Sequence, residues 1–137
     1  MLGGDVKMIG FIFSLMIAII TFGMAVLQLS LTFGAPFGEY VLGGRNKVLP
    51  LKMRFVSNIF SLVFLFVGLA YLQRGKVVYL GLSSTVVNGV VIVNTMFLAY
   101  AIVGNGILTK SKKEKYLMTP LSVMQFLFSL ATLYFIR

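Results

Sequence analysis

The side chains that most often carry out protein chemistry are scarce in this sequence of 137 residues. It contains no Cys and no His, and its only carboxylates are Asp5, Glu39 and Glu114. Without thiols or imidazoles it lacks the common zinc ligands, the usual acid–base catalyst and any means of forming disulfides. One well-placed acid does not make a paired-carboxylate site or activate a nucleophile. We therefore expect a protein that is not an enzyme and uses no cofactor or metal.

Glu39 is the acid with the most informative surroundings. It follows a long apolar stretch, has aromatic and aliphatic neighbours that would partly desolvate it, and precedes four cations: Arg45, Lys47, Lys52 and Arg54. One interpretation is a structural ion pair with a nearby cation that holds this part of the chain in place. The other is an acid that binds a proton or a cation at the entrance of a polar axis. Asp5 and Glu114 are expected to be solvated charges.

Three carboxamides within the apolar stretches are further binding candidates. An amide has more hydrogen-bonding capacity than helix packing requires, and inside a membrane it must find partners or water. The predicted ligand-binding residues are Gln28, Asn88 and Gln125, together with Glu39, Tyr40, Arg45 and Arg54. Either the amides converge on a cavity or they serve helix packing alone, and the sequence leaves both interpretations open.

Four long uncharged runs must position these residues. Only 11% of the chain is charged and 59% is hydrophobic, whereas a soluble domain has roughly 25% charged residues. The charges leave uncharged runs at 8–38, 55–73, 77–109 and 116–136, and a helix of about 20 residues crosses a membrane. We predict a multi-pass protein of the cell membrane, with one transmembrane domain over 1–137 and spans at about 8–33, 55–72, 78–103 and 117–136.

Small and polar residues recur along each predicted span at heptad spacing. The first span carries Ser14, Ala18, Thr21, Ala25, Gln28 and Thr32; the second Ser57, Ser61, Gly68 and Tyr71; the third Gly81, Ser84, Asn88, Thr95 and Asn105; the fourth Ser122, Gln125, Ser129 and Thr132. Small residues let membrane helices approach closely, and a seven-residue period predicts a left-handed supercoil. The predicted fold is an all-α, left-handed, antiparallel four-helix bundle around a partly polar axis.

The segment 34–50, here called the first loop, joins the first two predicted spans. It combines glycines and prolines with large apolar residues such as Phe37, Tyr40 and Leu49, whereas a flexible linker would be rich in Ser and other polar residues. Glycines beside large apolar side chains favour a compact loop with unusual backbone dihedrals. We expect an ordered loop folded onto the mouth of the bundle.

The first loop also carries a recognisable motif. Gly34-Ala35-Pro36-Phe37-Gly38-Glu39-Tyr40, followed by Gly43-Gly44 and Leu49-Pro50, resembles the signature of small prokaryotic four-helix membrane proteins with a G-x-P-W-G-E stretch, a Gly-Gly pair and a Leu-Pro after the first span. Phe37 stands where that family has Trp. The resemblance implies a shared fold and an importance of this loop, and it implies no activity.

The basic residues predict an orientation in the membrane. Four lie on the side of the two termini and the middle loop: Lys7, Arg74, Lys76 and Arg137. Eight lie on the side of the other two loops: Arg45, Lys47, Lys52, Arg54, Lys110, Lys112, Lys113 and Lys115. Because Lys and Arg accumulate in cytoplasmic loops, both termini are expected outside the cytoplasm.

These features predict a small polytopic protein that binds or transports a small molecule or a lipid through the bundle axis under the first loop. The alternative is a non-catalytic accessory or immunity subunit that docks to a larger membrane complex. The net charge of +9 indicates membrane phosphates rather than nucleic acid, because the cations lie at the ends of apolar runs. The expected partners are the lipid bilayer, a lipid or small-molecule ligand, and a second copy or a larger complex.

Overall fold

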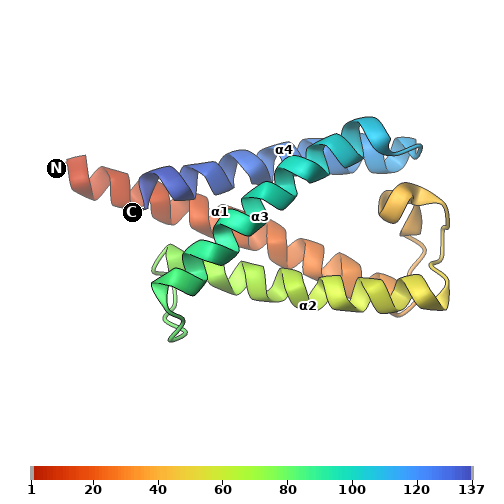
Figure 1. Ribbon diagram of the computed structural model, residues 1–137, viewed down its shortest axis with the longest axis horizontal. Helices are drawn as coiled ribbons and strands as arrows, with labels where there is room; N and C mark the ends of the chain where they lie inside the picture. The colour runs from red at the N-terminus through yellow and green to blue at the C-terminus, as the bar shows by residue number, and fades with distance from the viewer. Residues whose placement is uncertain (1, 137) are drawn as a thin grey trace.

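The computed structural model describes residues 2–136, which fold into four long helices. They are α1 (Leu2–Thr32), α2 (Leu51–Arg74), α3 (Ser84–Val103) and α4 (Lys112–Phe135), and the described part of the chain contains no strand. The helices run alternately in opposite directions, so both termini lie at one end of the bundle (Figure 1). All four are long and apolar enough to cross a membrane, as predicted for a multi-pass membrane protein. The left-handed supercoil stays a prediction.

The helices pack in a ring. α1 contacts α2 and α4, and α3 contacts the same two helices. Near the termini the helices converge on a buried apolar cluster that includes Ile17, Val67 and Val91. Towards the other end, α4 separates from α1 and α2, and the first loop lies between them (Figure 1). The helices therefore pack closely around this apolar cluster, and the first loop holds them apart towards its own end of the bundle.

Glycines allow α1 and α2 to approach each other closely. A Cβ atom added at Gly68 would lie 2.6 Å from Cε1 of Phe22, and one added at Gly75 would lie 2.5 Å from Cβ of Ser14. Both distances are shorter than real carbon contacts, so a side chain at either position would have to displace its neighbour on α1. The small residues predicted to permit close packing have that role between these helices.

Three helices begin earlier than the predicted spans. α1 and α2 begin earlier because charged residues such as Asp5, Lys52 and Arg54 continue the helices beyond their apolar runs. α4 begins at Lys112, before the predicted 117, because the Ser111 hydroxyl accepts a hydrogen bond of 3.3 Å from the Glu114 N–H and caps the helix. Charge marks the end of a hydrocarbon span rather than the end of a helix.

The third helix begins later than the predicted position 78. Residues 77–83 form a non-helical segment organised by Gln73, whose amide oxygen accepts hydrogen bonds of 3.2 Å from the N–H groups of Leu80 and Leu82. The amide nitrogen of Gln73 donates to the Leu82 carbonyl at 2.6 Å. Ser83 then caps α3 by accepting a hydrogen bond from the Val86 N–H at 3.2 Å. A π-helical turn, η3 (Gly104–Leu108), follows α3.

The first loop is ordered and folded onto the bundle, as expected. It contains two short 3₁₀ turns, η1 (Gly38–Tyr40) and η2 (Leu42–Gly44), and its Val41 and Leu49 are buried against Leu31 and Met118. The Gly38 N–H donates to the Lys47 carbonyl at 2.9 Å and closes the loop on itself. The apolar residues of the loop thus form a second small core between the separated helices.

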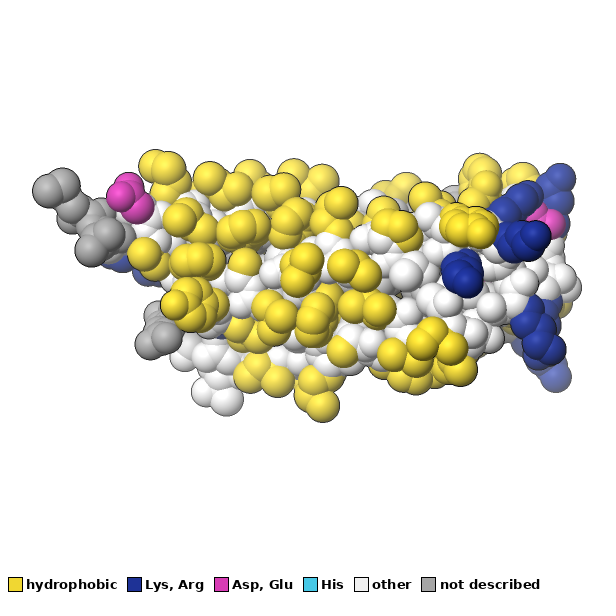
Figure 2. Space-filling model, turned by 90° about the horizontal axis from the view of Figure 1, so that it is seen from above, with side chains coloured by type: hydrophobic (Ala, Val, Ile, Leu, Met, Phe, Trp, Pro, Cys, Tyr) yellow, Lys and Arg dark blue, Asp and Glu magenta, His cyan; other side chains and the backbone are white. Residues whose placement is uncertain are grey.

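The surface has the pattern of a membrane protein. Apolar side chains are exposed along the length of the bundle, and a group of Lys and Arg side chains gathers at the end that carries the first loop (Figure 2). In a membrane, this distribution would put the basic residues at an interface and the apolar ones along the hydrocarbon. Arg137, which was counted with the opposite end, lies outside the described residues.

Candidate ligand-binding cavity

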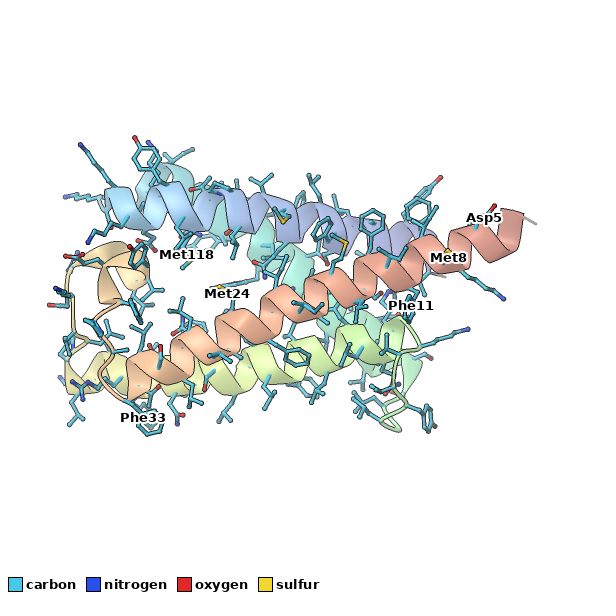
Figure 3. All side chains as sticks on the ribbon, turned by 180° about the vertical axis from the view of Figure 1, so that it is seen from behind. Asp5, Met8, Phe11, Met24, Phe33 and Met118 are labelled. Atoms are coloured by element: carbon cyan, nitrogen blue, oxygen red, sulfur yellow. The ribbon has the colours of Figure 1, made fainter. Side chains whose placement is uncertain are left out.

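A cavity of about 410 Å³ lies beneath the first loop, where α4 separates from α1 and α2. All four helices and the loop line it. Met24 of α1 and Met118 of α4 point into this space from opposite sides (Figure 3). Its volume falls within the range of small-molecule sites in proteins.

Three of the seven predicted ligand-binding residues line the cavity: Gln28, Tyr40 and Gln125. Gln28 is only 5% exposed, and its amide oxygen Oε1 has no hydrogen-bond partner among the described residues. Gln125 faces the cavity from α4 and is also buried. Tyr40 belongs to the first loop and covers the cavity at its end. The structure therefore brings two of the three amides together with the loop.

The remaining four predicted residues lie elsewhere. Asn88 is exposed on α3, and its amide oxygen accepts a hydrogen bond from the Arg74 guanidinium. Arg45 is exposed and does not line the cavity. Arg54 donates through Nε to the Leu49 carbonyl at 2.9 Å and so supports the base of the first loop. Asn88 misses the axis because the buried face of α3 runs through Val87, Val91, Asn94 and Leu98, and Asn88 lies beside that face.

Glu39 pairs with a cation far away in the sequence. Its carboxylate contacts the Lys113 ammonium on α4, not one of the four cations that follow it in the loop. This hydrogen bond, and then the attraction between the two charges, lower the pKa of Glu39 from its ordinary value. The Lys113 ammonium also lies 5.8 Å from the centre of the Tyr40 ring. The arrangement favours the structural interpretation of Glu39.

The backbone of the first loop is also fixed to the start of α4. The Ser111 hydroxyl donates to the Glu39 carbonyl at 2.6 Å. Gly44 has a positive φ of 68°, and a Cβ atom there would lie 2.2 Å from Cβ of Ser111. Only glycine fits this position without strain or collision. The second glycine of the Gly-Gly pair therefore lets the loop seat against α4.

Glu114 was expected to be a solvated charge, and the structure shows that this expectation is wrong. It is 6% exposed, lines the cavity, and accepts a hydrogen bond of 2.5 Å at Oε2 from the Thr109 hydroxyl. The expectation was wrong because the lysines on either side of Glu114 suggested a solvent-exposed charged segment. The spacing of Ser111 and Glu114 matches a helix-capping pattern, and this signal could have placed the acid in the first turn of α4.

A hydrogen-bonded group of four side chains, here called the polar network, lies between the cavity and the termini. It consists of Tyr71, Asn94, Thr95 and Ser129. The Tyr71 hydroxyl shares a hydrogen bond of 2.6 Å with Ser129 and accepts one of 2.9 Å from the Asn94 amide. Thr95 and Ser129 share another of 2.6 Å. Asn94 also lines the cavity, so the network extends from the cavity wall towards the termini.

Asn94, Asn105 and Ser122 are cavity residues that were not in the predicted set. Asn105 follows α3 in the π-helical turn and donates from its amide to the Ser122 hydroxyl at 3.0 Å. Asn105 and Ser122 belong to the predicted heptad tracks. Asn94 precedes Thr95 by one position and lies outside the predicted track of the third span, so the heptad spacing did not single it out.

No protein-family model, curated protein or solved structure matches this chain. The family resemblance of the first loop therefore stays a prediction.

Proposed function

We propose that this protein binds a small amphipathic molecule or a lipid in the cavity beneath the first loop. The observation that carries the proposal is Gln28, a buried amide whose oxygen lacks a hydrogen-bond partner and which lines the cavity. An unpaired buried acceptor costs roughly 1 to 3 kcal/mol. A ligand or bound water that donates to this oxygen would recover that free energy.

The cavity walls suit the apolar part of such a ligand. Phe60 and Phe64 of α2 face Phe97 and Tyr100 of α3 across the region where these helices line the cavity. Tyr100 is 66% exposed, so this wall also meets the lipid side of the bundle. Apolar and aromatic walls with a few polar groups are typical of small-molecule sites. Access from the bilayer would suit a ligand that partitions into membranes.

Binding is favoured over transport because the polar network blocks the axis. Tyr71 and Ser129 are fully buried, and their hydroxyl groups are hydrogen-bonded to each other and to α3. A ligand that passed along the axis would have to break these bonds. The cavity therefore resembles a pocket with a floor, and we propose a non-catalytic binding role for it.

We also propose that the end with the first loop faces the cytoplasm. The structure places all eight loop cations on the helix ends and connections of that side of the bundle, and positive residues accumulate on the cytoplasmic side. Both termini would then lie outside. A reporter active only in the cytoplasm tests this orientation when it is fused to the C-terminus, and activity would overturn it.

Photolabelling tests the binding role. A medium-chain alcohol carrying a diazirine is added to the protein in lipid nanodiscs, and labelled peptides are mapped with and without excess unlabelled alcohol. We expect saturable labelling of cavity residues such as Met24 and Met118. Ala101→Phe, which fills the cavity from α3, should abolish it. The matched control Ala99→Phe, on an exposed position outside the cavity, should leave it unchanged.

The result that would overturn the binding role is labelling that is uniform along the lipid face, cannot be competed and is the same in both variants. The axis would then be dry, and the accessory-subunit alternative would be favoured.

A further inference from the structure

Glu114 is a buried carboxylate on the wall of an otherwise mostly apolar cavity. It projects from the first turn of α4, and among residues 2–136 only Thr109 donates a side-chain hydrogen bond to it. Its position near the helix N-terminus explains how the charge is tolerated, because the helix dipole favours a negative charge there. That role requires no access to the cavity, whereas Glu114 lines it.

Among residues 2–136, no Lys or Arg neutralises Glu114. The only ion pair there joins Lys113 to Glu39, so the lysine next to Glu114 in the sequence is directed to the loop. No Lys or Arg side chain of this part of the chain lines the cavity. The cavity therefore contains one acid and no fixed cation, a charge distribution that disfavours anionic ligands.

Five aromatic side chains complete the wall: Tyr40, Phe60, Phe64, Phe97 and Tyr100. The faces of aromatic rings attract organic cations, and they also provide apolar contact for a hydrocarbon chain. The free amide oxygen of Gln28 adds an acceptor for an N–H group. The acid, the aromatic rings and the free acceptor all match one chemical class.

We infer that the cavity selects lipophilic amines in their protonated form, with the Glu114 carboxylate as counter-ion. This inference rests on the proposed binding function and specifies its ligand class. The ammonium group would donate to Glu114, and the hydrocarbon part would lie against the aromatic wall. The buried carboxylate would then have the cation that the protein itself does not supply.

The test compares two diazirine probes of equal chain length, a primary amine and an alcohol, at neutral pH in nanodiscs of zwitterionic lipid. We expect the amine probe to reach half-maximal labelling of the cavity at about tenfold lower concentration than the alcohol probe, because its ammonium group forms a charge-assisted hydrogen bond with Glu114. Glu114→Gln keeps the shape and removes the charge, and it should abolish this preference. Asp5→Asn makes the same change in net charge at the opposite end and should retain it.

The outcomes separate the two proposals. If both probes label the cavity of the wild type equally, or if Glu114→Gln keeps the preference, the inference on ligand class is wrong while the binding function stands. If neither probe gives saturable labelling, the binding function is wrong as well. The wild-type comparison needs no variant, so it decides the matter even if Glu114→Gln does not fold.

Discussion

The two ends of the bundle use similar polar side chains in opposite ways. Near the termini, Tyr71, Thr95 and Ser129 are buried and hydrogen-bonded to one another. Beneath the first loop, Gln28 and Gln125 are equally buried but line a cavity, and the Gln28 oxygen has no partner. The difference arises because the helices converge at one end and the loop separates them at the other. A polar residue on an inward face thus supports packing or binding according to the distance between helices.

The largest expected effect concerns the loop that separates the helices. Gly44→Ala should reduce the free energy of unfolding by about 3 kcal/mol, because it adds strain at positive φ and a collision with Ser111. Gly43 also has positive φ but an added Cβ would meet nothing within 4 Å. Gly43→Ala should therefore lose only about 1 kcal/mol. Unfolding in mixed detergent micelles measures the free energy of unfolding of both variants. Equal losses would show that the contact between the first loop and α4 contributes little to stability.

The second effect concerns the polar network. Tyr71→Phe removes a hydroxyl that joins Asn94 to Ser129, so we expect a loss of about 1 to 2 kcal/mol in the same unfolding assay. Tyr100→Phe provides the matched control, since Tyr100 is largely exposed to the lipid side. Its effect should stay within about 0.5 kcal/mol. An unchanged stability of Tyr71→Phe would mean that packing around the polar network does not depend on these hydrogen bonds.

A smaller effect is expected from the ion pair that holds the loop to α4. Because Lys113 lowers the pKa of Glu39, the pair stabilises the fold above the ordinary carboxyl pKa of about 4.3. This contribution is lost as the pH falls through the lower pKa of the folded state. The wild type should lose stability on acidification more than Glu39→Gln does, in thermal melts across acidic pH. A variant more stable than the wild type at neutral pH would contradict the structural role.

The smallest effect is expected at Gln28. Gln28→Leu removes an amide whose oxygen has no partner, and leucine is well tolerated inside a membrane helix. Its free energy of unfolding should therefore not fall, and any change should be a gain of up to about 1 kcal/mol, the lower end of the cost of an unpaired acceptor. A loss as large as that of Tyr71→Phe would show that Gln28 is bonded within the protein and that the two ends do not differ.

The sequence predicted the helices well because hydrophobic length determines them. It also predicted the buried faces of three helices. The buried residues of the predicted tracks are Ser14, Ala18, Thr21, Ala25 and Gln28 on α1, Ser57, Ser61, Gly68 and Tyr71 on α2, and Ser122, Gln125, Ser129 and Thr132 on α4. Heptad spacing succeeds there because the small and polar residues face the other helices. It failed for Asn88, because the buried face of α3 runs through Val87, Val91, Asn94 and Leu98, one position away.

The ionic contacts were harder to predict because they join distant parts of the chain. Glu39 has four cations close to it in sequence, yet its partner is Lys113 on α4. Glu114 sits among lysines and is nevertheless buried. Both outcomes depend on the packing of the first loop against α4, where Gly44 lies close to Ser111. Local charge patterns carry no information about such a contact.

A density map of the protein in a lipid nanodisc tests most directly whether the loop end holds a ligand-accessible cavity. We predict non-protein density beneath the first loop, within hydrogen-bond distance of the Gln28 amide, and none within the polar network around Tyr71. Helices closed on each other at the loop end, with the Gln28 amide bonded to protein side chains, would contradict it.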